Sequence, residues 1–330
     1  MNETLNERQQ SVCDFLRHYQ NTLTQELENV DGGAHFIEDA WQRDDLGYGM
    51  TRVIKNGDLF EQGGVNFSAI RGDTPPKSLL GRMPELAGVP FWGAGVSLVL
   101  HPKNPYCPTA HLNYRYFEAG NVWWFGGGCD LTPYYAFRED CRHWHSTIKQ
   151  TMDQHDPHFY PAFKYWCDEY FYNHHRGETR GIGGSFYDHL NGDAGVLIKP
   201  DYARQSEQGS HAALSLQQAE KSWEALFSFQ QANAHAFLPA YLPIIQRRRQ
   251  MPYTDQQRQF QLYRRGRYVE FNLLHDRGHL VRDQIKRTDR IDLNEFTTVG
   301  SLGIRLRASG GFPRSGIDRG VFETTPGLDK

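Results

Sequence analysis

Cysteine pairs, long apolar runs and an excess of charge are all missing from this chain, and each absence excludes a class of protein. The five cysteines are odd in number and form no C-x-x-C pair, which argues against a disulfide framework and against a thiolate zinc site. No stretch approaches the roughly 20 apolar residues of a membrane span. Residues 1–10, MNETLNERQQ, lack the basic and apolar regions of a signal peptide. We therefore expect a cytoplasmic protein without a transmembrane segment.

The net charge of -3 gives no electrostatic reason to expect a nucleic-acid partner. The chain is rich in core-forming residues, because 38% of its 330 residues are hydrophobic and 13% are aromatic. A chain of this length and composition can bury a large core, and it contains no internal repeats. We expect one domain over residues 1–330.

Strand patterns come early in the chain and helix patterns come late. A hairpin is expected over 51–62 around Asn56 and Gly57. Further strands are expected at 64–70, 95–101, 109–118, 121–125 and 266–275. One helix is expected after a capping box of Thr4 and Glu7, and another after an N-cap at Thr132. Two more are expected over 158–174 and over 217–249, the last with breaks at Pro239 and Pro243. The polar stretch 191–221 is expected to be an inserted loop. This order predicts an α+β fold with a large, mostly antiparallel sheet and helices packed on it.

The stretch 109–118, TAHLNYRYFE, sorts its chemistry onto one side when it is read as a strand. Successive side chains of a strand point to opposite faces, so His111, Asn113 and Arg115 share one face. Ser97 and His101 share a face of the preceding strand in the same way. An exposed strand face is normally polar, but five such residues around one turn favour a site that moves protons and binds a carboxylate.

Two later segments carry further candidates. The glycines of GGGCD, 126–130, are expected to turn sharply and to present Asp130 beside the first site. The segment 164–188 places Arg176 and Arg180 beside several glycines. It reads either as a core helix that ends in a glycine-rich turn or as a clamp for a carboxylate or phosphate, because guanidinium binds these groups bidentately.

Four long motifs follow one another within about 30–278: GVSLVLHPKNPYCPTAHLNYRYFE, FGGGCDLTPYY, KYWCDEYFYNHHRGETRGIGG and YRRGRYVEFNLLHDRG. Together, and in this collinear order, they resemble the oxygen-dependent coproporphyrinogen III oxidases of haem biosynthesis. The resemblance implies a flattened antiparallel sheet sandwiched between helices, a homodimer and a tetrapyrrole substrate. It also implies oxidative decarboxylation of two propionates to vinyl groups, with O2 as co-substrate and no organic cofactor. Asn173, Ser185 and Tyr187 depart from the residues usual in the family.

The same resemblance assigns roles within the site. Asp130 is expected to hold the pyrrole N–H groups and to take a proton, and His111 is the candidate acid or base. Arg115 is expected to position the propionate that is cleaved. The candidate substrate-binding set is Ser97, Asn113, Tyr114 and Arg115.

The sequence leaves open whether the protein binds a metal. Some members of the family are described with histidine ligands, which would map to His101, His111, His145 and His175, whereas others are regarded as metal-free. Two alternatives to the enzyme therefore stand beside it. One is a non-haem oxygenase that depends on a divalent metal, and the other is a tetrapyrrole-binding protein without chemistry.

The sequence changes character after Gly278. All 7 tryptophans and all 17 tyrosines lie at or before Tyr268, and the only aromatic residues in the last 52 residues are Phe296, Phe312 and Phe322. Codons compatible with residues 279–308 can be read one nucleotide later as TWFGIKSNGRIESILMSLPPLAAWEYDYA, which resembles the family's own continuation. We therefore expect a single-nucleotide frame error between codons 278 and 279, and a tail over 279–330 that departs from the family.

Overall fold

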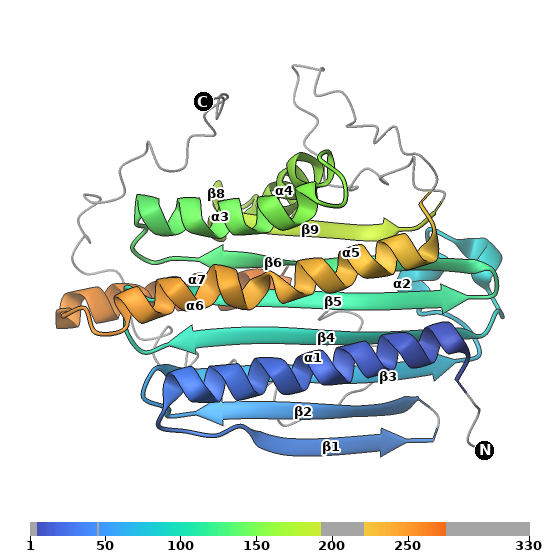
Figure 1. Cartoon of the computed structure of the whole chain (residues 1–330), viewed down its shortest axis with the longest axis horizontal. Helices are drawn as coiled ribbons and strands as arrows, with labels where there is room; N and C mark the ends of the chain where they lie inside the picture. Colours follow the sequence, from blue (N-terminus) through green and yellow to red (C-terminus); the bar gives the residue numbers. More distant parts are fainter. Residues whose placement is uncertain (1–4, 45, 193–220, 275–330) are drawn as a thin grey trace.

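A seven-stranded antiparallel sheet forms the centre of the computed structural model, which describes residues 5–44, 46–192 and 221–274 (Figure 1). The strands lie in the order β1-β2-β3-β4-β5-β6-β9. Their bounds are β1 Ile37–Arg43, β2 Gly47–Lys55, β3 Phe60–Gly72, β4 Phe91–Pro102, β5 Thr109–Ala119, β6 Val122–Thr132 and β9 Gly183–Leu190. The predicted α+β fold is confirmed, because helices pack on this sheet.

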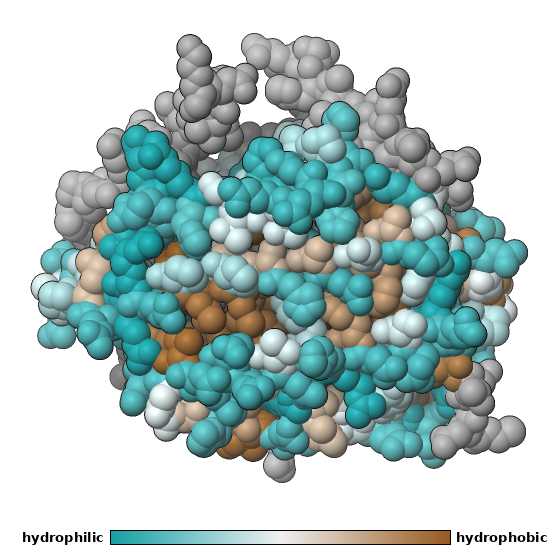
Figure 2. All heavy atoms as spheres, viewed as in Figure 1, coloured by the Kyte–Doolittle hydropathy of each residue, from teal (hydrophilic) through white to brown (hydrophobic). Residues whose placement is uncertain are grey.

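Most of the helices lie on one face of the sheet. Their bounds are α1 Glu7–Asp31, α3 Arg138–Asp153, α4 Phe159–Tyr170, α5 Trp223–His235 and α6 Phe237–Arg248. Val96, Leu98 and Leu100 of β4 point toward them and join the main core. Figure 2 shows this face, where hydrophilic residues predominate on the outer surface and apolar residues show between the helices.

The alternate residues of β4 point to the opposite face, which α7, Asp255–Leu274, covers in part. His101 of β4 packs edge-on against Tyr268 of α7, with ring centroids 5.6 Å apart. The side chain of Gln261 donates to the carbonyl oxygen of Pro102 at 2.9 Å. Helices therefore contact both faces of the sheet. Within the described ranges, no helix combines the length and the apolar content needed to cross a membrane.

Short elements complete the described chain. They are α2 Lys77–Leu80, the 3-10 helix Pro84–Leu86, and the two-stranded hairpin of β7 Tyr172–Asn173 and β8 Glu178–Thr179. The hairpin that was predicted around Asn56 and Gly57 is confirmed between β2 and β3, and Asn56 has a φ of 55°.

The most important correction concerns residues 266–275, where we expected a strand. Residues up to Leu274 belong to α7 instead. The buried residues of α7 are Gln261, Arg265, Tyr268 and Phe271, which recur at helical spacing. Two of these four are polar, so a count of apolar residues misses the helical period. The strand that returns to the sheet late in the chain is β9, which begins inside the segment 164–188, where we expected a helix with a glycine-rich turn or an anion clamp and no strand.

Several helix boundaries also differ from the expectation. The first helix is capped by Asn6, whose side chain accepts from the N–H of Gln9, while Thr4 of the predicted capping box lies outside the described residues. Thr132 ends β6, and α3 begins only at Arg138. The helix expected over 217–249 is divided at Ala236 into α5 and α6, while Pro243 lies inside α6. The helix expected over 158–174 ends earlier, at Tyr170. Most of the predicted loop 191–221 and all of the tail 279–330 lie outside the described residues.

Candidate active site

A histidine and an aspartate meet on the face of the sheet that α7 covers in part. His111 on β5 and Asp130 on β6 are register neighbours, and Nδ1 of His111 lies 2.7 Å from Oδ1 of Asp130. Arg115 lies four residues along β5, so the alternation places it on the same face, as the sequence predicted. The glycines before Asp130 do not form the turn that we expected, because they continue β6. Two neighbouring strands therefore supply this site.

Asp130 is not open to solvent. It is 2% exposed, and Arg180 from the chain between β8 and β9 closes over it. Nη2 of Arg180 donates to both carboxylate oxygens at 2.7 Å. The guanidinium carbon lies 3.8 Å from the ring centroid of Phe171 and 4.4 Å from that of Tyr268. Arg180 is therefore fixed between two aromatic rings and pairs with Asp130.

The charge of Asp130 is set by these two partners. Burial raises the pKa of the Asp130 carboxyl, but the Arg180 guanidinium and the hydrogen bond from His111 more than offset this effect, so the net pKa is lowered. Asp130 is consequently an anion at neutral pH. A carboxylate in this position orients the imidazole ring of His111 through Nδ1 and leaves the other ring nitrogen to face a reactant.

The predicted arginine clamp is made, but around carboxylates of the protein itself. Arg180 holds Asp130, and Arg176 donates from Nη2 to Glu270 of α7 at 2.7 Å. Sequence reasoning named both arginines and missed their partners. The partners lie 50 residues away for Arg180 and 94 residues away for Arg176, so no local pattern could have found them.

Arg115 forms a second charged group on the same face. Its Nη2 lies 3.0 Å from Oδ1 of Asp188 on β9, and its Nη1 donates to Oδ1 of Asn113 at 3.3 Å. Ser97 on β4 is the register partner of Asn113, so three of the four predicted substrate-binding residues share this face. Sequence reasoning missed Asp188, which alternates with the buried Tyr187 along β9. The alternation of a buried Tyr187 with a polar Asp188 is the sequence signal that could have placed Asp188 on this face.

Tyr114 is wrongly placed in the predicted substrate-binding set. It is fully buried on the opposite face, where its hydroxyl donates to the carbonyl oxygen of Asn233 at 3.0 Å. The alternation along β5 requires this, because Tyr114 lies between two residues that face the site. Its function is to pack α5 onto the sheet.

The four histidines that were named as metal ligands have different hydrogen-bond partners. Nδ1 of His101 lies 3.2 Å from Oγ1 of Thr109, and Nδ1 of His145 lies 2.9 Å from the hydroxyl of Tyr160. Nε2 of His175 lies 2.9 Å from Oε1 of Glu270. Burial and the nearby Lys164 ammonium lower the pKa of His145 to about 3. Over the described part of the chain, no three side chains of the metal-binding types gather to hold an ion.

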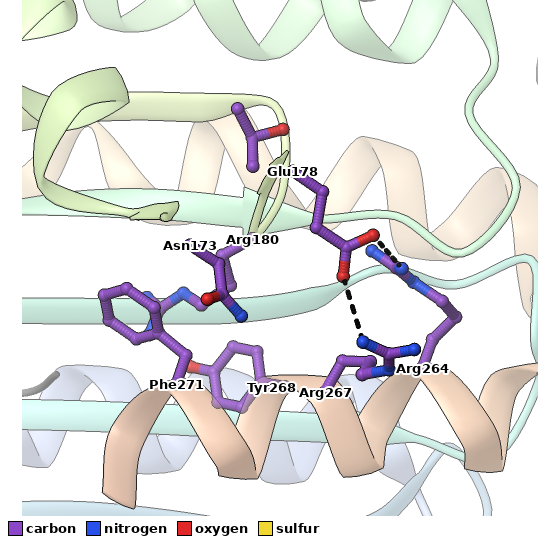
Figure 3. Close-up of a pocket in the computed structure, with 8 residues that line it drawn as sticks. Asn173, Glu178, Arg180, Arg264, Arg267, Tyr268 and Phe271 are labelled. Atoms are coloured by element: carbon purple, nitrogen blue, oxygen red, sulfur yellow. Dashed lines mark hydrogen bonds and ion pairs between the residues drawn. The ribbon is translucent and has the colours of Figure 1, made fainter. Parts of the chain in front are cut away.

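A small pocket lies beside Arg180, between α7 and the β7-β8 hairpin (Figure 3). Arg264 on one of its walls donates to Glu178 at 2.9 Å, and Tyr268 and Phe271 form another wall. The cavity volume of this pocket is only about 10 Å³, room for about one water molecule. Sites for drug-sized ligands span about 300–1,000 Å³. It is therefore a recess beside the Asp130 site and not a complete cavity for a large ligand.

Comparison with known proteins agrees with the resemblance that the motifs suggested. The family model described as "Coproporphyrinogen III oxidase" matches residues 11–292. A protein of Prochlorococcus marinus (strain MIT 9313), named "Oxygen-dependent coproporphyrinogen-III oxidase", is 54% identical over 261 residues, covering 78% of this chain and 73% of its own. A protein with the same name from Parasynechococcus marenigrum (strain WH8102) is also 54% identical, covering 78% of this chain and 70% of its own. The chain belongs to the coproporphyrinogen III oxidase family.

Proposed function

We propose that the protein converts coproporphyrinogen III to protoporphyrinogen IX by oxidative decarboxylation of two propionates to vinyl groups, with O2 as the oxidant. The family supports this reaction, and one observation carries it to particular residues. His111 and Asp130 are in direct contact on the same sheet face as Arg115. A base, its orienting carboxylate and a guanidinium for an anionic substrate are the groups that the reaction needs.

The chemistry defines what each group has to do. In each step the bond between the propionate Cα and its carboxylate carbon breaks. The propionate Cβ, which is attached to the pyrrole ring, gives up one hydrogen with its electron pair. Two electrons and two protons pass to O2, so one propionic acid and one O2 give one vinyl group, CO2 and H2O2. Arg115 holds the carboxylate in place before it leaves. His111, which Asp130 orients, is the acid or base that transfers a proton through its free ring nitrogen.

Asp130 is the residue whose proposed role most needs a rearrangement. It is covered by Arg180, so direct contact between Asp130 and a pyrrole N–H requires Arg180 and α7 to shift. In the arrangement described here, Asp130 acts through His111. The four histidines are not gathered within the described ranges, and no step is assigned to a metal.

We also propose a tetrapyrrole substrate, a homodimer and a cytoplasmic location. The substrate is a tetrapyrrole with four carboxylates, and the family resemblance implies a homodimer. All five cysteines are free thiols, which fits a reducing compartment such as the cytoplasm.

Release of CO2 from coproporphyrinogen III tests the function. The purified protein is expected to release CO2 and form protoporphyrinogen IX, and binding without CO2 would identify the tetrapyrrole-binding alternative. Elemental analysis of active protein separates the metal-dependent oxygenase, which would retain iron or manganese in proportion to its activity.

The variant Asp130→Asn tests the residues. A neutral amide cannot stabilise a protonated His111, so kcat is expected to fall on the order of 100-fold, with a smaller change in KM. Asp39→Asn on the exposed edge strand β1 is the control and should retain full activity. Unchanged turnover in Asp130→Asn would remove Asp130 from the mechanism.

A further inference from the structure

We propose that Asp188 is a positioning residue that holds the Arg115 guanidinium in the orientation needed to bind the propionate that is cleaved. This inference rests on the proposed function, because it takes Arg115 as the group that binds the propionate. Asp188 acts through Arg115 and needs no contact with the substrate.

The contacts fix Arg115 from two sides. Oδ1 of Asp188 lies 3.0 Å from Nη2, and Oδ1 of Asn113 accepts from Nη1 at 3.3 Å. The side chain of Arg115 is still 35% exposed, while that of Asp188 is 25% exposed. The pair is therefore anchored on the sheet, yet part of the guanidinium remains accessible to a ligand. A guanidinium has five N–H donors, so it can keep both contacts and still bind a carboxylate.

Gly126 leaves the space that this pair occupies. A Cβ atom on Gly126 would lie 2.8 Å from Nε of Arg115 and 2.8 Å from Oδ1 of Asp188. Any other residue at this position of β6 would push the two side chains outward. The first glycine of GGGCD is thus explained by the charged pair and not by a turn.

The backbone after Asp188 holds the carboxylate in place. His189 has a φ of 53°. In the described part of the chain, only His189 and Asn56 are non-glycine residues with a positive φ. Its N–H donates to Oδ1 of Asp188 at 3.1 Å, and its ring stacks on Trp124 with centroids 4.5 Å apart. A left-handed conformation is unfavourable for a non-glycine residue. Such local strain, held by surrounding contacts, is frequent at functional sites.

The charges of Arg115 and Asp188 also hold the two side chains together. Burial raises the pKa of Asp188, but the charges of Arg115 and then of His189 more than offset this effect, so the net pKa is lowered and the carboxyl is ionised at neutral pH. The ion pair keeps the guanidinium plane from rotating. Since a misplacement of about 1 Å at a substrate-binding group can cost on the order of 100-fold in rate, a fixed plane has a measurable effect on turnover.

Asp188→Asn is the decisive variant. It should lower kcat on the order of 100-fold with KM changed by less than about threefold, measured as CO2 release. Asp168→Asn breaks an ion pair of similar exposure with Lys164 on α4 and should leave the rate unchanged. In an Arg115→Ala background, Asp188→Asn should cause no further loss, because its effect passes through Arg115. A full additional loss in that background would show a separate structural role and overturn the inference.

A second readout does not depend on turnover. In crystal structures of Asp188→Asn and Gly126→Ala, the Arg115 guanidinium is expected to leave its place over Gly126. An unmoved Arg115 in Asp188→Asn would overturn the inference even if the rate falls. If the parent protein releases no CO2, the proposed function fails, while the position of Arg115 in the two variants still decides whether Asp188 and Gly126 place it.

Discussion

The Arg180 and Asp130 pair allows the most direct test of the energetics of this site. The side chains of both residues are 3% exposed, and two N···O distances of 2.7 Å join them. The substitution Arg180→Met removes the charge and keeps an apolar side chain of similar length between Phe171 and Tyr268. It leaves the carboxylate of Asp130 buried, with the hydrogen bond to His111 as its remaining side-chain contact among the described residues.

The expected loss follows from burial. Removal of one partner from a buried ion pair costs about 3–5 kcal/mol, because the remaining charge is uncompensated. Arg176 on the same segment provides the matched control, since its pair with Glu270 is 35% and 24% exposed. Arg176→Met should therefore cost less than about 1 kcal/mol. Urea unfolding of the parent and both variants at pH 7 measures the two differences.

The dependence on pH gives the sign of the effect. In the parent, the lowered pKa of Asp130 contributes stability that is present above the unfolded pKa of about 3.9 and lost as the pH falls through the folded value. In Arg180→Met, burial is opposed only by His111 and raises the pKa of Asp130, so protonation relieves the buried charge as the pH falls. The gap between parent and variant should thus shrink from pH 7 to about pH 4.5.

Two results would refute this reasoning. One is a loss in Arg180→Met no larger than that in Arg176→Met. The other is a gap that stays constant between pH 7 and about pH 4.5. The double variant Arg180→Met with Asp130→Asn removes the buried charge, and it should recover part of the lost stability at pH 7.

Three further predictions follow from other parts of the chain. Arg115→Lys should lower kcat/KM at least about tenfold in the CO2 assay, because an ammonium cannot bind both Asp188 and a carboxylate with the planar geometry of guanidinium; parent-like kinetics would show that Arg115 does not bind the propionate. Glu61→Gln should destabilise the fold by about 2–4 kcal/mol in urea, since it leaves the buried Arg265 of α7 without its carboxylate partner; a loss below about 0.5 kcal/mol would contradict this. Resequencing codons 275–285 should reveal a one-nucleotide shift, and the restored frame should give a more stable and more active protein; an intact frame there would show that the tail is native.

Local patterns predicted the strands well where the chain alternates. In β5, every second side chain from His111 to Arg115 faces the site, and the residues between them are buried. This alternation is a property of the backbone, so it could be read before any partner strand was known. It also explains why Tyr114 should have been left out of the substrate-binding set, since its place in the alternation already assigned it to the core.

Local patterns failed where long-range contacts decide the structure. The residues 266–274 alternate in a way that is typical of a strand, but Gln261 and Arg265 are buried by polar contacts with Pro102 and Glu61, and these contacts fix α7 as a helix. The glycines of GGGCD were expected to turn, but β9 pairs with them and extends the strand. Pro102 and Glu61 are far from α7 in the sequence, and β9 is far from the glycines of β6.

The sequence by itself determined the family, the α+β class and the sheet face that carries His111, Asn113 and Arg115, because these depend on motifs and on the two-residue period of a strand. Only the tertiary structure decided which carboxylates the arginines bind. Asp130 meets Arg180 and Arg115 meets Asp188 across separations of tens of residues, and these pairings depend on strand register and on the packing of α7. Register and packing are set by the burial of the whole sheet, and no local stretch of sequence encodes them.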